Sequence, residues 1–331
     1  MKALVTGGGG FLGSAVVRQL VARGDSVRSL SRGSYPELAA LGVETFRGDL
    51  CDSGVVRAAA AGCDIVFHVA AMAGIAGSAR EFAAANIEGT DNVVAACRAN
   101  GVHRLVYTST PSVVSARGGI EGGDESLPYP RRHHAPYPAT KAAAEQSVLA
   151  ANDADLATVA LRPHLIWGPG DTQLVPRIID RARRGRLRFV GDGTNVIDST
   201  YVDNAAWAHL LAGDRLHPGS TVAGRVFFIS QGEPLAIREL VNRILDAAGL
   251  AAVSATIPFP VAHALGGVAE AAFALAGRGA EPPMTRFLAR QLSTPHWFDI
   301  SAARRDLGYE PRVSIAEGLV RLREHLASEQ G

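Results

Sequence analysis

Short apolar runs alternate with segments of helical periodicity through the first half of the chain. Six runs are rich in β-branched or other apolar residues and predict strands over Lys2–Thr6, Ser26–Ser31, Val43–Arg47, Asp64–Val69, His103–Ser109 and Ala157–Leu161. Between the runs, apolar residues recur every three or four positions, which predicts helices over Phe11–Arg23, Ser53–Ala61, Glu81–Asn100 and Tyr137–Ala151. Strands that are separated by helices are typical of an α/β fold with a doubly wound parallel sheet.

The pattern changes after Arg162-Pro163, where glycine-rich turns at 168–171 and 191–193 interrupt it. Arg225–Ser230 reads as a late strand and Ile237–Ala248 as a helix. We expect a sheet domain over 1–162 and a smaller domain made mainly from 163–331, with some of its segments returning to the sheet. Because ligands of such sheets sit outside the carboxyl ends of the strands, the smaller domain is expected to bind substrate.

Composition suits a buried core, since 47% of the 331 residues are apolar and 20% are charged. The net charge of +1 gives no overall field that would attract nucleic acid. Six arginines between 177 and 188 form one basic patch, which we interpret as a solvated helix face because no aromatic residues interleave with it, with a role near phosphates as the alternative. The cysteines Cys51, Cys63 and Cys97 lack metal or disulfide spacing, so we predict no metal site and a reducing, cytoplasmic environment.

An apolar segment over 257–276 is interrupted by prolines, glycines and Glu270. A helix that spans a membrane needs about 20 apolar residues with few or no charges. We therefore expect a buried or pocket-lining helix here, and contact with a membrane surface is the alternative. The first residues lack the long apolar stretch and cleavage site of a signal peptide.

Glycines follow the first predicted strand directly and open the first predicted helix. Gly7, Gly10 and Gly13 let the backbone turn tightly and approach a pyrophosphate, whose charge faces the helix N-terminus at Phe11 and Leu12. A glycine cluster alone is a weak signal, but a strand before it and a helix after it favour a dinucleotide site of the Rossmann type.

The second predicted strand ends without the acidic residue that would hold the ribose 2′-hydroxyl of NAD. Ser31 and Arg32 stand there instead, and they can hydrogen-bond and pair with a 2′-phosphate. This pattern predicts NADP(H) as the cofactor, with a plain surface arginine as the alternative for Arg32.

Two later strand ends complete the predicted cofactor site. Asp49 could accept from the adenine amino group while Leu50 covers the ring, although a helix-capping aspartate would look much the same. Ala70 and Ala71 close the fourth strand, and their small side chains would leave room for cofactor.

Candidate chemistry lies in Tyr137-Pro138-Ala139-Thr140-Lys141, which places a phenol and an ammonium one helical turn apart. We expect the ammonium to lower the pKa of the tyrosine, which could then exchange a proton with a carbonyl oxygen beside a hydride. A hydroxyl from Tyr107-Thr108-Ser109-Thr110, at the end of the fifth strand, could steady the developing alkoxide.

With these motifs the chain resembles the extended short-chain dehydrogenases/reductases, and within them the 3β-hydroxysteroid dehydrogenase branch. The matching segments are Thr6–Gly13, His68–Ala71, Asn86–Thr90, Tyr107–Thr110, Tyr137–Lys141, Leu161–Pro163 and Tyr201–Asn204.

The resemblance implies that Tyr137 is the acid/base and that Lys141 also holds the nicotinamide ribose. It assigns the family's catalytic serine or threonine to Thr110, while Thr-Pro at 110–111 departs from the usual pattern and leaves Ser109 and Ser112 as rivals. Pro163 and His164 would lie near the nicotinamide.

Three further segments are similar to the bacterial 2-alkyl-3-oxoalkanoate reductases of long-chain olefin biosynthesis, namely Arg162–Asp171, Tyr201–Leu211 and His296–Ser301. That resemblance implies NADPH-dependent reduction of a hydrophobic β-keto acid, whose acyl chain the 257–276 segment could line. The group that binds the substrate's carboxylate stays open among four candidates, Arg131, His133, His134 and His164.

Three alternatives remain at this stage. The chain could be a hydroxysteroid or 4-carboxysterol dehydrogenase, a nucleotide-sugar epimerase, or a binding protein that senses NADP(H) without turnover. The missing acid argues against an epimerase that holds NAD, and the intact Tyr137 and Lys141 argue against a sensor. The resemblance also implies a homodimer through the helix of Tyr137, while membrane-surface or multi-enzyme association stays open.

Overall fold

The computed structural model describes residues 1–74, 77–114, 118–133, 135–275 and 284–329. Its centre is a seven-stranded sheet of order β12-β7-β5-β4-β1-β2-β3 in which every neighbouring pair is parallel. The strands are β1 (Lys2–Thr6), β2 (Ser26–Ser31), β3 (Glu44–Arg47), β4 (Ile65–His68), β5 (Arg104–Thr108), β7 (Ala157–Pro163) and β12 (Arg225–Ile229). The predicted doubly wound parallel sheet is confirmed.

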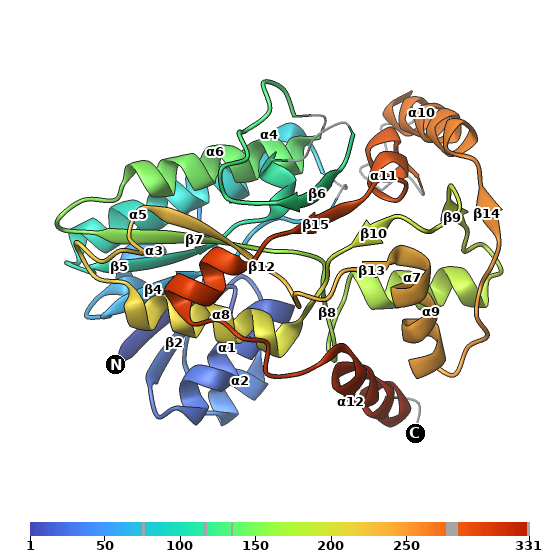
Figure 1. Ribbon diagram of the computed structural model, residues 1–331. Coiled ribbons are helices and arrows are strands. Elements are labelled where there is room, and N and C mark those ends of the chain that lie inside the picture. The colour runs from blue at the N-terminus through green and yellow to red at the C-terminus, as the bar shows by residue number, and fades with distance from the viewer. Residues whose placement is uncertain (75–76, 115–117, 134, 276–283, 330–331) are drawn as a thin grey trace.

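Helices cover both faces of this sheet (Figure 1). On one face α1 (Phe11–Ala22) packs against α8 (Val202–Arg215), and on the other α5 (Gly89–Ala99) packs against both α3 (Ser53–Ala60) and α6 (Pro136–Ala150). The side chains of β1 show why both faces of the sheet need a cover of helices. Its Ala3 and Val5 join the core under α1 and α8, whereas Leu4 joins the core on the opposite face.

The helix predicted over 81–100 is built from three consecutive pieces, α4 (Ala79–Ala83), the π-helical turn η1 (Ala84–Glu88) and α5. Ser78 caps α4, and its hydroxyl accepts from the Glu81 N–H in a capping box. Short elements also follow strand ends in this half, namely α2 (Pro36–Ala40), the 3₁₀ turn η2 (Pro111–Val114) and β6 (Ile120–Gly123).

A second, smaller layer lies beyond the carboxyl ends of the main strands. It contains the mixed sheet β13-β10-β15-β6 and the pairs β8–β11 and β9–β14. These strands are β8 (Ile166–Trp167), β9 (Phe189–Val190), β10 (Val196–Ile197), β11 (Thr200–Tyr201), β13 (Leu235–Ala236), β14 (Thr256–Ile257) and β15 (His296–Phe298). Its helices are α7 (Leu174–Arg183), α9 (Ile237–Ala247), α10 (Phe259–Leu275), α11 (Arg286–Gln291) and α12 (Ile315–Ser328). The π-helical turn η3 (Ala303–Leu307) packs instead on α8 and β12 of the main sheet.

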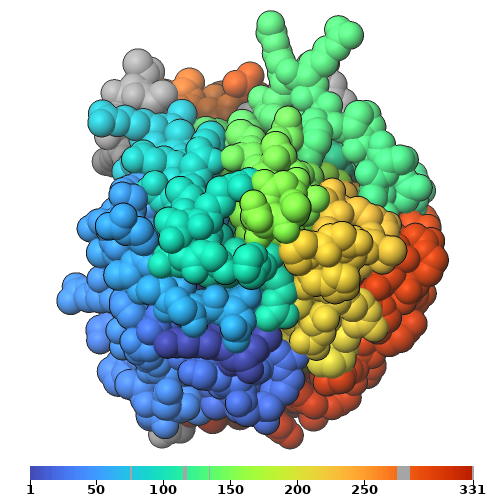
Figure 2. Space-filling model, turned by 90° about the vertical axis from the view of Figure 1, so that its left-hand side faces the viewer, coloured from blue at the N-terminus to red at the C-terminus, as the bar shows by residue number. Residues whose placement is uncertain are grey.

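The later part of the chain also returns to the main sheet. β12 pairs with β7 along five residues, and α8 packs on α1. Figure 2 shows the resulting surface, on which blue and green segments of the first half lie beside yellow and red segments from beyond residue 200. The sheet is therefore built from both halves of the sequence.

The apolar 257–276 segment does not form the buried or pocket-lining helix that its composition suggested. Its helix α10 lies at the outer edge of the molecule against α11 (Figure 1) and leaves Val261, Leu265 and Val268 exposed. The prediction is wrong because α10 is covered on one side only. Among the described residues, no helix combines the length and apolar character needed to cross a bilayer.

Candidate functional site

A cavity of about 520 Å³ opens at the carboxyl ends of the central strands. It is lined by residues from β2, the turns after β1, β3 and β4, the end of β5, the start of α6 and the end of β7. The predicted site residues that line it are Gly7, Gly10, Phe11, Leu12, Gly13, Ser31, Arg32, Asp49, Leu50, Ala70, Ala71, Thr110, Tyr137, Lys141 and Pro163. Folding thus brings fifteen of the sixteen predicted positions to one cavity, and His164 is the exception.

The glycine loop forms one end of this cavity. Gly7 has φ +70°, and its N–H donates to the Leu30 carbonyl at 2.8 Å. A Cβ atom on Gly13 would lie 2.0 Å from the Gly7 carbonyl oxygen, so a side chain there would break the turn. Gly10 is the N-cap of α1 and supplies no side-chain cap, which leaves the positive end of the helix facing the cavity. A pyrophosphate fits this arrangement.

The end of β2 lies beside the loop. The Gly9 N–H donates to the Ser31 hydroxyl at 3.3 Å, and the exposed Arg32 side chain lines the cavity. Tyr35, which no sequence motif indicated, also lines it, and its ring would be 2.2 Å from a Cβ on Gly9. Its position in a Gly-Ser-Tyr-Pro turn directly after a strand that feeds the site was the one available signal.

Asp49 and Ala70 are held by short-range contacts at the cavity wall. The Cys51 N–H donates to Asp49 at 2.9 Å, and this backbone hydrogen bond lowers the pKa of the carboxyl. The Ala70 N–H donates to the Thr6 hydroxyl at 3.2 Å, and His68 Nδ1 lies 2.7 Å from the same oxygen. Burial lowers the pKa of His68 to about 3, so this strand-end contact is made by a neutral imidazole.

The other end of the cavity holds the predicted chemistry. The Lys141 ammonium donates to the Thr108 carbonyl at 2.6 Å and lies 4.1 Å from the centre of the Tyr107 ring. Burial lowers the pKa of Lys141 to about 7, and the Glu145 carboxylate opposes that shift. Lys141 therefore gains or loses its proton near neutral pH, and the Glu145 carboxylate favours its charged form.

The phenol of Tyr137 has a raised pKa, contrary to the expectation that Lys141 would lower it. Burial of the phenol is the main cause, and a hydrogen bond with Thr110 opposes it. The main influences on this pKa do not include Lys141, whose ammonium donates to the Thr108 carbonyl. The resulting phenol keeps its proton at neutral pH, which suits a proton donor.

Thr110 and its two rivals differ in their surroundings. The Thr110 hydroxyl lies 3.2 Å from that of Ser112, and Thr110 is the hydroxyl that interacts with Tyr137. Ser109 also lines the cavity, and its buried hydroxyl has no hydrogen-bond partner among the described residues. The geometry favours Thr110 as the group beside the phenol.

A buried ion pair supports this end of the cavity from behind. Arg162, just before Pro163 on β7, donates to both carboxylate oxygens of Glu145 at 2.6 and 2.9 Å. Glu145 lies one helical turn beyond Lys141 and also accepts from the Tyr129 hydroxyl at 2.6 Å. Both charged side chains are almost fully buried, at 2% and 0% exposure. The pair ties the helix of Tyr137 to the strand that ends at the cavity.

His164 does not line the cavity, although the resemblance placed it there. Its ring packs edge-on against His296 and Phe298, with centroids 4.9 and 5.4 Å away. Burial holds its pKa well below the usual range, so it is neutral. Arg131 and His133 also do not line the cavity, and His134 lies outside the described residues.

The cavity has further walls that the sequence did not reveal. Leu165 lies between β7 and β8 with φ +39°, a left-handed conformation that is rare for leucine and concentrates at functional sites. Ile166 and the 171–173 segment complete this side. Asp171 there accepts from three backbone N–H groups at the start of α7, so its carboxylate is already engaged. Nothing in the sequence signals that this leucine adopts a positive φ.

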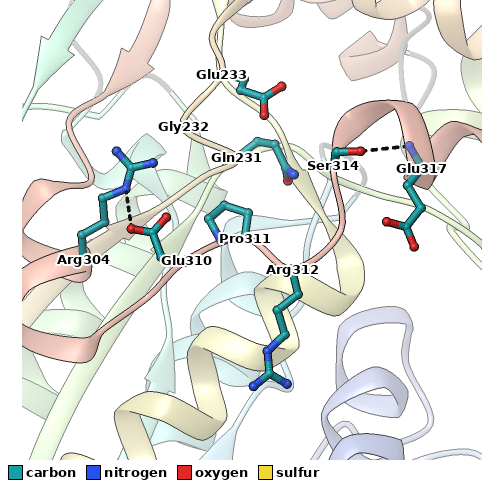
Figure 3. A pocket seen from close by; sticks show the side chains of 9 residues that line it. All are labelled: Gln231, Gly232, Glu233, Arg304, Glu310, Pro311, Arg312, Ser314 and Glu317. Atoms are coloured by element: carbon teal, nitrogen blue, oxygen red, sulfur yellow. Dashed lines mark hydrogen bonds and ion pairs between the residues drawn. The ribbon is translucent and has the colours of Figure 1, made fainter.

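A second, polar hollow of about 320 Å³ lies beside β12 and the chain that leads into α12 (Figure 3). Arg304 and Glu310 pair across it at 3.4 Å, and the buried Gln231 accepts from the Asn204 amide at 3.0 Å. These contacts join α8 to the following segments. None of the predicted site residues lines this hollow, so we assign it a structural role.

Known proteins resemble the chain along most of its length. Residues 4–261 match the model of the 3-beta hydroxysteroid dehydrogenase/isomerase family. A 2-alkyl-3-oxoalkanoate reductase from Stenotrophomonas maltophilia is 58% identical over 99% of this chain and 100% of its own. A 2-alkyl-3-oxoalkanoate reductase from Shewanella oneidensis is 47% identical over 98% of this chain and 86% of its own.

Solved structures share the fold along the whole chain. MoeE5 in complex with UDP-glucose and NAD superposes with a TM-score of 0.77 at 26% identity, covering 100% of both chains.

Proposed function

Because the chain belongs to the 3-beta hydroxysteroid dehydrogenase/isomerase family and is an NAD(P)-dependent oxidoreductase of the extended short-chain type, we propose that it reduces a hydrophobic 3-oxo compound. Specifically, we propose the NADPH-dependent reduction of a 2-alkyl-3-oxoalkanoate to the 3-hydroxy acid. The observation that carries this proposal is the 58% identity, over nearly the full length, to a reductase of that name.

The proposed chemistry uses groups at one end of the cavity. The nicotinamide, when bound, supplies a hydride to the carbonyl carbon. Tyr137 donates its phenolic proton to the carbonyl oxygen, and Thr110 stabilises the charge that develops on that oxygen. Lys141, charged below about pH 7, would hold the nicotinamide ribose beside the phenol. The carbonyl thereby gains one hydride and one proton and becomes an alcohol.

The choice of NADPH is supported by the end of β2. Ser31 and the exposed Arg32 line the cavity, and no carboxylate occupies the end of that strand. A 2′-phosphate could accept from the Ser31 hydroxyl and pair with the Arg32 guanidinium, whereas a ribose 2′-hydroxyl would lack its usual acidic partner.

A second candidate is oxidation of a 3β-hydroxysteroid or 4-carboxysterol. The description of the matching family favours it, and the same tyrosine would then act as the base. The cavity wall of Leu165 and Ile166 is apolar in either case. An epimerase or a cofactor sensor has less support, because the strand end lacks the acid for NAD and the proton donor is intact.

The test is NADPH oxidation across 3-oxo acids that differ in length and in 2-alkyl branching, beside 3β-hydroxysteroids with NAD and NADP. We expect turnover of branched 3-oxo acids to rise with chain length and to exceed any steroid turnover. Faster oxidation of a steroid than reduction of every 3-oxo acid would replace the first candidate by the second. If the chain bound cofactor but turned over neither 3-oxo acids nor steroids, it would be a cofactor sensor.

A further inference from the structure

The outer face of α10 is apolar throughout its described length. Val261, Leu265 and Val268, which we call the apolar stripe, recur at helical spacing and are 47%, 54% and 68% exposed. The exposed residues between and beyond them on the same helix are alanines and one proline, at 260, 264, 271 and 272. No charged side chain on α10 is exposed among residues 259–273.

The one acidic residue in the described part of this helix pairs with α11 instead. Glu270 accepts from the Arg286 backbone N–H at 2.8 Å and pairs with its guanidinium at 2.7 Å, which fixes α10 on α11. A surface helix normally turns its polar face outward. α10 does the reverse, and it carries three of the five large hydrophobic residues that are exposed in the described part of the chain.

A cluster of cations lies close to the start of α10. The arginine cluster consists of four exposed residues, Arg183, Arg184, Arg186 and Arg188. Only Arg184 among them pairs with an acidic side chain in the described residues, with Asp180 at 2.8 Å. The cluster leads into β9, and β9 pairs with β14, which leads into α10. The arginines precede this parallel pair and α10 follows it, so two strands of about 7 Å separate them along one edge of the molecule (Figure 1).

We propose that the apolar stripe and the arginine cluster together dock the protein on an anionic lipid surface. Aliphatic side chains would enter the boundary between headgroups and acyl chains while the arginines pair with lipid phosphates. The positive charge of the arginine cluster favours an anionic lipid surface over a second copy of this chain. A symmetric pair of chains joined through α10 would bring two arginine clusters toward one interface, and the stripe lacks the aromatic residues that protein interfaces favour.

The experiment is flotation of the full chain with vesicles of equal parts phosphatidylglycerol and phosphatidylcholine, and with vesicles of phosphatidylcholine alone. We expect the chain to float with the anionic vesicles and at least tenfold less with the neutral ones. The L265E/V268E variant should lose at least tenfold of the bound fraction, because two carboxylates would enter the apolar boundary. R186E/R188E should lose a similar factor, and raised salt should mimic it.

The matched control is Val320→Glu, because Val320 on α12 is 54% exposed, as Leu265 is. It should float as the native chain does, and all variants should keep the native circular dichroism spectrum. The proposal fails if the native chain does not bind anionic vesicles, or if L265E/V268E binds them as well as the native chain. It also fails if sedimentation shows a dimer that L265E/V268E dissociates, since a second copy would then cover the stripe.

Discussion

The two ends of the cavity are built on different physical principles. At the cofactor end, the loop from Gly7 to Gly13 offers backbone N–H groups and an uncapped helix terminus within one short stretch of sequence. At the chemical end, Tyr137 and Lys141 depend on a strand carbonyl and on the buried Glu145–Arg162 pair, which come from three separate elements. One end is fixed by local backbone shape, and the other by buried charges that must be matched across the fold.

Each end is therefore vulnerable to a different kind of substitution. An added atom disrupts the glycine loop, whereas removal of one partner disrupts the buried ion pair. The two ends should therefore separate in experiments that measure cofactor binding, turnover and stability independently.

The largest expected effect is at the chemical end. Tyr137→Phe removes the proposed proton donor and should lower kcat for 3-oxo acid reduction by about 1,000-fold, within the range of a lost general acid. NADPH affinity, measured by fluorescence titration, should change little because the cofactor end is untouched. A variant that retains full activity would mean that another group supplies the proton.

Removing the carboxylate behind Lys141 should affect both stability and pH dependence. Glu145→Gln leaves Arg162 buried without its partner, which should cost about 3–5 kcal/mol of unfolding free energy in denaturant titrations. Glu145 raises the pKa of Lys141, so its loss lowers that pKa further below about 7. Reduction by the native chain should decline as pH rises through about 7, and the variant should decline at lower pH.

The control for this prediction is the E145Q/R162M double variant, in which no charge of the pair remains. It should recover much of the stability while keeping the shifted pH profile of kcat/KM. If the double variant regained the native profile, the shift would come from loss of structure rather than loss of charge.

The cofactor end should lose NADPH affinity when one methyl group is added to the glycine loop. Gly13→Ala would place a Cβ 2.0 Å from the Gly7 carbonyl, and we expect about a 100-fold loss of NADPH affinity from the displaced turn. Gly118→Ala is the matched control, because nothing lies within 4 Å of its Cβ position. Similar losses in both variants would contradict the proposed role of the loop.

The smallest effect concerns the choice between the two nicotinamide cofactors. Arg32→Ala should weaken NADPH binding about tenfold and leave NADH binding unchanged, since the lost contact is an exposed charge-assisted hydrogen bond. Steady-state kinetics with both cofactors measures the ratio. A native preference for NADH that survives in the variant would show that Arg32 is only a surface residue.

The sequence predicted the features that depend on neighbouring residues and missed those that depend on contacts between distant segments. The strands β1 and β2 and the glycine loop follow from apolar periodicity and turn chemistry within short windows, and their bounds agree with the structure. The raised pKa of Tyr137, the inward turn of His164 toward His296, and the positive φ of Leu165 could not be read in this way. Each depends on segments that meet only after folding.

Composition also misled where burial depends on neighbours. The 257–276 segment has the residues of a core helix, and α10 is exposed because the fold supplies a partner on one side only. The roles of the site residues, the division at 162/163 and the homodimer stay predictions.

The return of β12 and α8 to the main sheet limits how the chain can be engineered. A fragment that ends at residue 162 would leave the edge of β7 unpaired and uncover α1, which invites aggregation. Chimaeras meant to exchange substrate preference should therefore keep residues 202–215 and 225–229 native and graft only the stretches around them.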